Sequence, residues 1–458
     1  MYTISNKLKT FSIALIILGL LGVGYGFMTS HKSFEDVETM LAEETSHGGG
    51  HGEEAKPHVT EDASHDAEES ESHGEGTHGD ASESHVDAHK EHIEHVQHQI
   101  ANRPWSALYV AAFFFFMISL GVLAFYAIQF ASQSGWSPVL FRVMEGITSY
   151  VLPGGLIVLA IAVASGTIGH YNIFVWMDPD VVAHDKLIQA KAGWLNIVWF
   201  AVRGLIFIAG WSLYRHFARK FTIAQDSSND DSYFKKTFRI SAAFLVFFIY
   251  TESIMSWDWI MSVDPHWYST LFGWYVFAGM AVSGITVIAF ISLYLKSRGH
   301  LEIVNDSHIH DLAKFMFGFS IFWAYLWFSQ FMLIWYANIP EEVTYFVTRI
   351  EDYNGLFFGM LVLNFVFPFL VLMNSDYKRI PWFVVMAGII ILVGHYIDVY
   401  VMIMPATVGD RWTFGIPELS SIMLFAGLFL FIVFTALTKA PLIVKRNPFL
   451  KESEHFHY

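Results

Sequence analysis

The sequence contains no cysteine among its 458 residues. This absence excludes disulfide bonds, thiolate-ligated iron–sulfur clusters, cysteine-containing zinc sites and covalent attachment of c-type haem to this chain. Charged residues are also scarce, at 15% of the chain, against about 25% in an ordinary soluble domain. Basic residues do not outnumber acidic ones, so the chain lacks the basic surface of a nucleic-acid-binding protein.

The residues that are present indicate a membrane protein. Hydrophobic residues make up 54% of the chain and aromatic residues 17%, which is more apolar surface than a soluble protein of this size buries. Ten apolar stretches are long enough to cross about 30 Å of hydrocarbon as helices. They run over residues 11–28, 106–131, 142–168, 192–215, 239–257, 270–295, 314–337, 355–374, 382–404 and 418–438. We therefore predict an all-α integral membrane protein with ten transmembrane helices.

One segment accounts for the whole net charge of −15. Residues 29–103 contain 19 Asp and Glu but only 4 Lys and Arg, whereas the rest of the chain contains 23 of each. The same segment holds 12 of the 22 histidines, and its low-complexity composition cannot bury enough apolar surface to fold alone. We predict four parts: an anchor helix over residues 1–28, an acidic His-rich loop over 29–103, a membrane domain over 104–440 and a tail over 441–458.

The Lys and Arg residues outside the spans predict the orientation. Eighteen lie on the side of the two termini and eight on the opposite side, and cytoplasmic loops carry the excess of positive charge. Both termini are therefore expected in the cytoplasm, with the His-rich loop facing outward. The first stretch follows Lys7 and Lys9 as a signal peptide would, but its long apolar run and the lack of an A-x-A site favour an uncleaved anchor.

Two patterns predict helices outside the spans. Apolar residues recur every seven positions ahead of the second span, at Val86, Ile93 and Ile100, which indicates a short amphipathic helix leading into it. The Asp-Pro pairs at 178–179 and 264–265 each have the form of a helix start, with Asp at the N-cap and Pro in the first turn. The first pair predicts an interfacial helix over residues 181–191.

Ionisable side chains inside apolar stretches indicate function, because each is costly in lipid unless it is paired or hydrated. The candidates for a proton path are Glu145, Arg203, Glu252, His395 and Asp398. Arg203 is expected near the middle of the fourth span, either in a structural ion pair or as a fixed charge at a site. Glu145 is expected just inside the cytoplasmic end of the third span, as an interfacial residue or as the point of proton uptake. His395 and Asp398 share a helix face and form either a proton relay or a structural pair.

Glu252 opens a stretch that is dense in aromatic and proton-active side chains. Trp257, Asp258, Asp264 and His266 follow it, with no Lys or Arg among them. A membrane-interface belt explains the aromatic residues, but it does not explain the acids and the histidine between them. We predict a polar cavity at the outward face, lined by these four residues.

The His-rich loop also raises the question of metal binding. His85, His89 and His92 fall along one helical face and are the candidate ligands, since clustered imidazoles bind zinc or copper weakly. No defined ligand spacing stands out, so a solvated spacer is the preferred interpretation.

The run TESIMSWDWIMSVDPHWYST at 251–270, followed by FGWY at 272–275, resembles the membrane subunits of alternative complex III, a bacterial quinol:cytochrome c or oxidase oxidoreductase. Those subunits are similar to the polysulphide-reductase (NrfD-like) membrane family. The anchor followed by an acidic His-rich loop resembles the F-type subunit, and the likeness covers most of residues 1–450.

The resemblance implies two four-helix bundles, spans 2–5 and 6–9, with spans 1 and 10 peripheral, in a bacterial inner membrane with the His-rich loop in the periplasm. It implies partners: an NrfD-like C-type membrane subunit, subunits bearing c-type haem, an iron–sulfur subunit and a terminal oxidase. Menaquinone or another quinone is the implied lipid-soluble cofactor, with the cavity as its binding surface. Such a subunit supplies a membrane scaffold and a proton path and is not catalytic alone.

Two alternatives remain open from the sequence. One is a stand-alone ion or metal transporter with the His-rich loop as a collector, although no pair of Gly- or Pro-broken spans stands at matching positions in two halves. The other is a structural anchor that conducts nothing.

Overall fold

The computed structural model describes residues 2–47, 80–168 and 173–457. Within them, ten helical spans are long and apolar enough to cross a membrane, and there is no strand. The predicted fold class is therefore confirmed, and the chain is a multi-pass helical membrane protein. The spans are α1 (Asn6–Ser30), α3 (Asp80–Ala131), α4 with α5 (Phe141–Ile147 and Val151–Thr167), α8 (Ile197–Gln225), α9 (Ser232–Trp259), α10 (Phe272–Ser297), α11 (Asp306–Ala337), α13 with α14 (Asn354–Leu361 and Phe367–Leu372), α15 (Pro381–Val408) and α16 (Ile416–Leu437).

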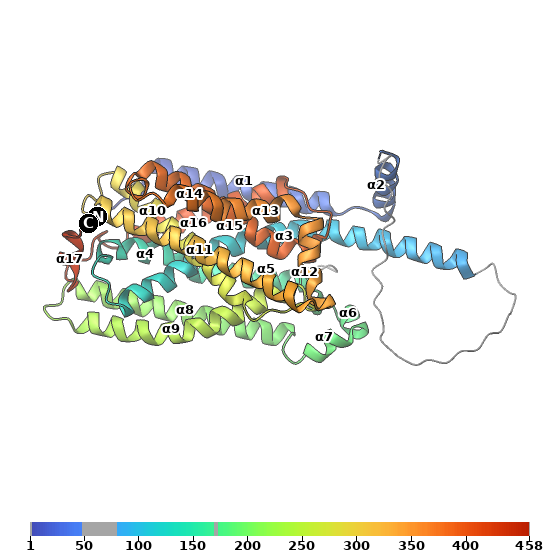
Figure 1. Ribbon diagram of the computed structural model, residues 1–458, viewed down its shortest axis with the longest axis horizontal. Helices are drawn as coiled ribbons and strands as arrows, with labels where there is room; N and C mark the ends of the chain where they lie inside the picture. The colour runs from blue at the N-terminus through green and yellow to red at the C-terminus, as the bar shows by residue number, and fades with distance from the viewer. Residues whose placement is uncertain (1, 48–79, 169–172, 458) are drawn as a thin grey trace.

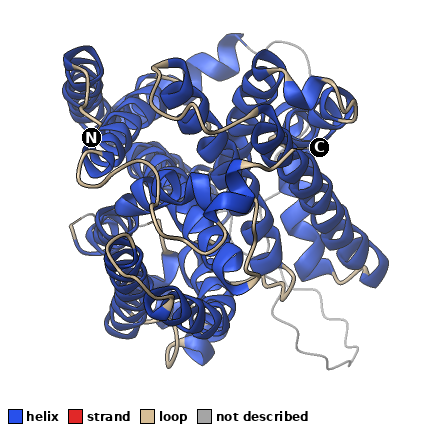
Figure 2. Ribbon diagram, turned by 90° about the vertical axis from the view of Figure 1, so that its left-hand side faces the viewer, coloured by secondary structure: helices blue, strands red, loops and turns tan. Residues whose placement is uncertain are grey.

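The spans form two bundles of four. Helices α3, α5, α8 and α9 pack together in the first, and α10, α11, α13 with α14, and α15 in the second. The bundles meet where α3 lies against α10 and α15 and where α9 lies against α10. Figure 2 shows the structure from the end and shows only helices and loops in its described part. Helices α1 and α16 are peripheral: α1 packs along α16, and α16 packs on α3.

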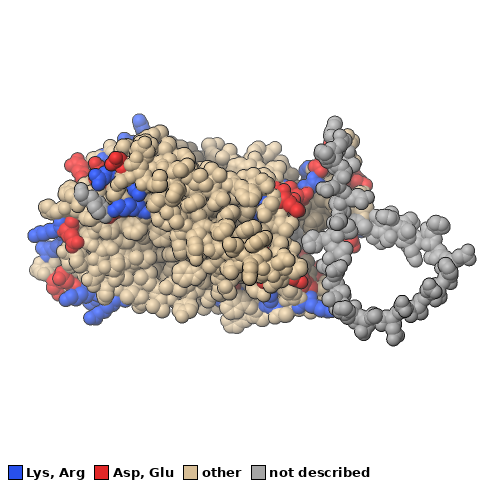
Figure 3. Space-filling view, in the orientation of Figure 1, with Lys and Arg blue, Asp and Glu red and all other residues tan. Residues whose placement is uncertain are grey.

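The chain has two polar ends and an apolar middle. Figure 1 shows both termini at one end and the short helices α6 (Pro179–His184), α7 (Lys186–Lys191) and α12 (Pro340–Glu351) at the other. Charged side chains gather at the two ends of the face drawn in Figure 3, with a band of uncharged residues between them. We call the end with α6, α7 and α12 the outward end, following the charge bias of the sequence, and the other the termini end.

The acidic segment is partly folded where the structure describes it. Residues Phe34–His47 form helix α2, and Val37 on it packs with Ile93 and Val96 of α3 in a small core of its own. The amphipathic helix expected before the second span is present, but it continues without a break into the span as α3. The sequence analysis predicted that helix but not α2, because the apolar positions of α2 are few and acquire a partner only in three dimensions.

A helix starts at the first of the two Asp-Pro pairs but not at the second. Asp178 caps α6 as predicted, and its side chain accepts a hydrogen bond from the Asp180 N–H. The expected single helix over 181–191 is broken at Asp185, which caps α7. No helix starts at Asp264-Pro265, where the prediction is wrong: the Asp264 carboxylate accepts from the His266 N–H in a local turn, which Asp favours as readily as a helix start.

Glycines let α1 approach α16 closely. A Cβ at Gly19 would lie 2.5 Å from the backbone nitrogen of Leu424, and one at Gly427 would lie 2.7 Å from the carbonyl oxygen of Ser12. Small residues on the facing surfaces of α1 and α16 let the two backbones come into contact. In lipid, such close van der Waals packing rather than the hydrophobic effect drives helix association. The packing of α1 therefore depends on residues that add no side-chain contact of their own.

We predict that Gly19→Val destabilises the chain by about 1–3 kcal/mol, as overpacking typically does, because backbone atoms of α16 block the new side chain. Gly24→Val is the matched control, since a Cβ at Gly24 on the same helix meets nothing within 4 Å. Thermal unfolding of both full-length variants in one detergent measures the difference. Equal melting temperatures would show that α1 is not held by this contact.

Candidate functional site

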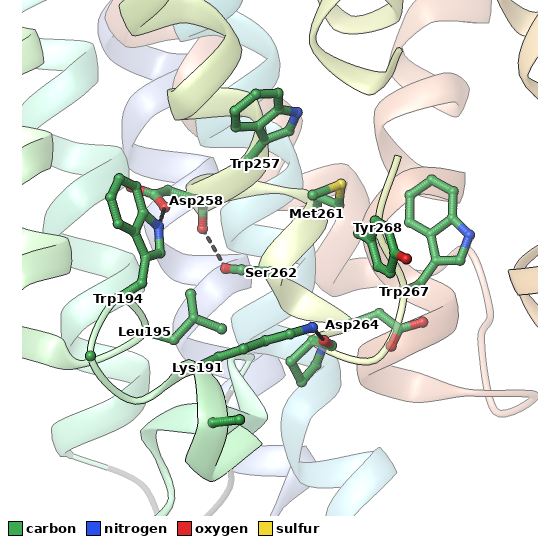
Figure 4. A pocket seen from close by; sticks show the side chains of 13 residues that line it. Lys191, Trp194, Leu195, Trp257, Asp258, Met261, Ser262, Asp264, Trp267 and Tyr268 are labelled. Carbon is green, nitrogen blue, oxygen red and sulfur yellow. Dashed lines mark hydrogen bonds between the residues drawn. The ribbon is translucent and has the colours of Figure 1, made fainter. Parts of the chain in front are cut away.

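A cavity of about 490 Å³ lies at the outward end of the first bundle. Its wall comes from the loop between α7 and α8 and from the end of α9 with the loop that follows (Figure 4). Of the four residues that the sequence analysis named, Trp257, Asp258 and Asp264 line it and His266 does not, and the lining is mostly apolar rather than polar. The remaining lining includes Lys191, Trp194, Trp267 and Tyr268.

Asp258 forms the polar base of this cavity. Its side chain is 1% exposed and receives Arg203 Nε at 2.6 Å and Arg203 Nη2 at 3.1 Å, one on each carboxylate oxygen. The indole N–H of Trp194 donates to the same carboxylate at 2.9 Å. The Arg203 guanidinium also lies over the Trp194 ring, 4.1 Å from its centroid. This bidentate geometry fixes both planar groups.

Arg203 lies nearer the outward end than expected. The sequence predicted a span over 192–215 with Arg203 at its middle, but α8 begins only at Ile197, where the Asn196 side chain caps it by accepting from the Trp199 N–H. The helix then continues to Gln225. Arg203 is thus in the second turn, and the carboxylate that a membrane-embedded arginine requires is Asp258, across on α9.

Two residues in the lining of this cavity carry an unpaired donor. The indole nitrogens of Trp257 and Trp267 are buried and have no hydrogen-bond partner among the residues that the structure describes. Buried donors are nearly always satisfied by protein, water or ligand. Trp257 therefore offers an N–H to an acceptor that enters the cavity.

Lys191 supplies a cation at the rim. Its ammonium group donates to the Pro265 carbonyl at 2.6 Å. Burial lowers the pKa of Lys191, although Asp264 and Asp185 act in the opposite direction. The carbonyl bond holds the loop after α9 against α7, and so closes one side of the cavity.

His266 joins the same two loops from outside the cavity. Its Nε2 lies 2.6 Å from a carboxylate oxygen of Asp185, the residue that caps α7. Burial pushes the pKa of Asp185 upward, but hydrogen bonds from the Ile188 N–H, the His266 ring and the Leu187 N–H outweigh it, so the pKa is lowered overall.

We predict that the α7 region loosens in acid. A carboxyl whose pKa is lowered by folding stabilises the fold above its ordinary pKa of about 4, and this contribution is lost as the pH falls through the folded-state value. Amide hydrogen exchange in residues 179–191 should therefore be less protected at pH 3 than at pH 6. Asp185→Asn is the control, because asparagine still caps a helix but does not titrate. The same pH dependence in both proteins would contradict this origin.

A second polar cluster lies in the outward half of the second bundle. The carboxylate of Asp398 accepts from the Tyr275 hydroxyl and, at 2.8 Å, from the Trp323 indole N–H. His395 Nδ1 lies 3.4 Å from the same carboxylate, so the pair share a helix face as predicted. Asp398 thus gathers partners from α10, α11 and its own helix α15.

Arg349 is a residue that the sequence reasoning missed. It was counted as a loop cation, yet α12 buries it to 4% exposure with its guanidinium over the Tyr345 ring. It donates to the carbonyls of Tyr345 and Met402, and it lines with Asp398 a cavity of about 10 Å³, which is room for about one water. Tyr345 stacks on Trp267 of the first cavity. The amphipathic pattern of 340–351, with Arg349 on its apolar face, was the available signal.

Glu145 belongs to a third cluster, at the termini end of the first bundle. It is buried and pairs with Arg142 at 2.6 Å, while Arg142 also pairs with Asp226 at 2.6 Å. The hydroxyls of Tyr126 and Thr222 donate to Glu145. Glu145 is therefore a buried and fully partnered group at the termini end, and Arg142, expected in a loop, is buried with it.

Glu252 stands alone between these clusters. It is 4% exposed, and it accepts hydrogen bonds from the hydroxyls of Ser253 and Ser256 on its own helix. It forms no ion pair with any residue that the structure describes. The hydrogen bonds of the described residues do not connect the three clusters to one another, so a proton path through Glu252 requires waters between them.

The candidate metal ligands are not gathered into a site. His89 and His92 are exposed on α3, and His89 lies 3.9 Å from Glu38; the side chain of His85 and residues 48–79 lie outside the described part. In that part, no group of three or more His, Cys, Asp or Glu could hold a metal ion.

No protein-family model and no curated protein sequence matches this chain.

Proposed function

We propose that this chain is a haem-free membrane subunit of a quinol-oxidising respiratory complex of the alternative complex III type, in a bacterial inner membrane. It anchors the complex, binds a quinone such as menaquinone at the outward cavity and contributes a proton path. Its partners are an NrfD-like membrane subunit, an iron–sulfur subunit, subunits with c-type haem and a terminal oxidase. Catalysis requires those partners, because this cysteine-free chain holds no thiolate-bound cluster or covalently bound haem.

The cavity at Asp258 is the observation that carries this proposal. Ligand sites are concave and mostly apolar, with a few fixed polar groups. Here the tryptophan rings supply the flat apolar walls, and the unpaired Trp257 N–H can donate to a ring carbonyl. The Arg203–Asp258 pair is the fixed polar group at the base. A quinone, which is a flat ring with carbonyl oxygens and an apolar tail, fits this chemistry.

Buried ionisable groups at both ends of the membrane support the proton path. Glu145 lies at the termini end, Glu252 and Arg203 lie further outward, and the pair His395 and Asp398 lies in the outward half of the second bundle. Intramembrane ionisable groups of this kind mark proton relays or structural pairs. The well-connected Asp398 cluster has the composition of a relay: a carboxylate, an imidazole and a phenol.

Purification in mild detergent tests the assembly. Pulling on this chain from native membranes should bring down an iron–sulfur subunit and give the visible spectrum of c-type haem. A colourless chain without partners would remove the respiratory role and favour a transporter.

A pair of variants tests the proton path. His395→Ala and Asp398→Asn, in assembled complex, should lower quinol turnover and proton release. Unchanged turnover and proton release in both variants would leave these residues with a structural role only.

A further inference from the structure

A second cavity, of about 210 Å³, lies between α3, α9 and α10, where the two bundles meet. Its wall is apolar and includes three aromatic side chains, Phe248 from α9 and Trp274 and Phe277 from α10. Glu252 is the one ionisable residue in its lining. We call this cavity the lipid-side crevice.

The crevice faces the bilayer rather than the aqueous loops. Ile249 and Trp274 at its edge are 50% and 47% exposed, and both lie within membrane spans. On the outward side α9 and α10 touch, since a Cβ at Gly273 would lie 2.9 Å from the Ser253 hydroxyl. Glu252 precedes Asp258 by six residues, or about 9 Å along the helix. The crevice is therefore a site separate from the outward cavity and is reached from the lipid.

Glu252 gives this crevice its chemistry. In the part of the chain that the structure describes, its carboxylate has two partners, the hydroxyls of Ser253 and Ser256 on its own helix, at 3.4 and 3.1 Å. A carboxylate without a cation is costly in an apolar wall, so the neutral acid is favoured there. A neutral carboxyl has one O–H donor and spare acceptor positions. It can therefore bind an oxygen of a molecule that arrives from the membrane, whether that oxygen is a carbonyl or a hydroxyl.

We propose that the lipid-side crevice binds the ring of a lipid-soluble quinone or quinol, with Glu252 hydrogen-bonded to a ring oxygen. The identity of the ligand rests on the proposed function. The aromatic walls suit a flat ring, the open side admits an apolar tail, and the carboxyl meets the one kind of polar atom such a ring carries. An acyl chain would fill the space but leave the carboxyl without a new partner. The site binds and orients; we assign no electron transfer to it.

Carbodiimide labelling of the full chain in its native complex tests this site. The O–H of a neutral carboxyl adds across one C=N bond of dicyclohexylcarbodiimide, and the acyl group then shifts to nitrogen, so a stable N-acylurea forms with no atom lost. Glu252 should be labelled by this lipid-soluble reagent. A short-chain naphthoquinone at about ten times its dissociation constant should slow the labelling about tenfold. Mass spectrometry of the peptide around residue 252 measures both.

Three controls define the outcome. Glu145, buried but paired with Arg142, should remain unlabelled. Glu252→Gln should remove the label while keeping the fold, and Trp257→Phe, in the outward cavity, should leave the protection at Glu252 unchanged. Absence of labelling at Glu252, or labelling that naphthoquinone does not slow, would overturn the proposal. If naphthoquinone slows the labelling of Glu252 in a chain that purifies without haem or partners, the crevice is still a quinone site but the proposed respiratory role is wrong.

Discussion

Arg142→Leu is expected to lower the free energy of unfolding by about 3–5 kcal/mol, the usual result of removing one partner from a buried ion pair. Arg142 holds Glu145 and Asp226 at once, each at 2.6 Å, and its side chain is 2% exposed. Its loss would leave two carboxylates close together with no cation between them. The decrease should be at the upper end of this range, because the carboxylates of Glu145 and Asp226 would repel each other and would remain shielded from water.

Arg215→Leu is the matched control in the same cluster. Among the described residues, Arg215 hydrogen-bonds to the Thr148 hydroxyl and the Glu145 carbonyl and forms no ion pair, so Glu145 keeps its ion-pair partner Arg142 when Arg215 is replaced. Reversible unfolding in mixed micelles should give a much smaller change for Arg215→Leu than for Arg142→Leu. Similar changes in the two variants would mean that the Arg142 ion pairs contribute little.

Arg203→Leu should lower the free energy of unfolding by a similar amount, about 3–5 kcal/mol. The decrease should be larger than that caused by Asp258→Leu. The reason is asymmetric exposure: the Asp258 side chain is 1% exposed and the Arg203 side chain 13%. An unpaired Arg203, near the outward end of α8, can extend its guanidinium to water. An unpaired Asp258 carboxylate stays in the interior.

The double variant Arg203→Leu with Asp258→Leu completes this test. Replacing a buried pair by apolar residues is often close to neutral, so the double variant should be more stable than Arg203→Leu alone. The coupling energy from the four unfolding curves measures the interaction. Additive effects of the two single changes would contradict the ion pair.

Hydropathy predicted the ten spans, because twenty or so apolar residues have no other stable place than a bilayer or a core. It predicted their ends less well. Helix α8 was expected over 192–215, yet it continues to Gln225, because polar residues such as Arg219 and Lys220 extend the helix beyond the apolar stretch that hydropathy detects. The depth of Arg203 was misjudged because the helix begins at Ile197 rather than at residue 192.

The partners of the buried charges could not be predicted in this way. Asp258 lies 55 residues from Arg203 and Asp226 lies 84 from Arg142, and no local period relates such positions. The sequence did indicate which side chains needed a partner, because these ionisable residues lie inside apolar stretches. The pair His395 and Asp398 was found because both residues lie on one helix, where spacing alone determines the shared face.

The contact of α1 with α16 has a consequence for biogenesis. The ribosome delivers α1 to the membrane first among the described spans and α16 last, yet the glycines of α1 have their partners on α16. Until α16 is made, α1 has its contact with α3 but lacks the closer contact with α16. Assembly therefore cannot be completed in order from the N-terminus. The contact between α1 and α16 joins helices that are far apart in sequence, and it forms only after α16 has been synthesised.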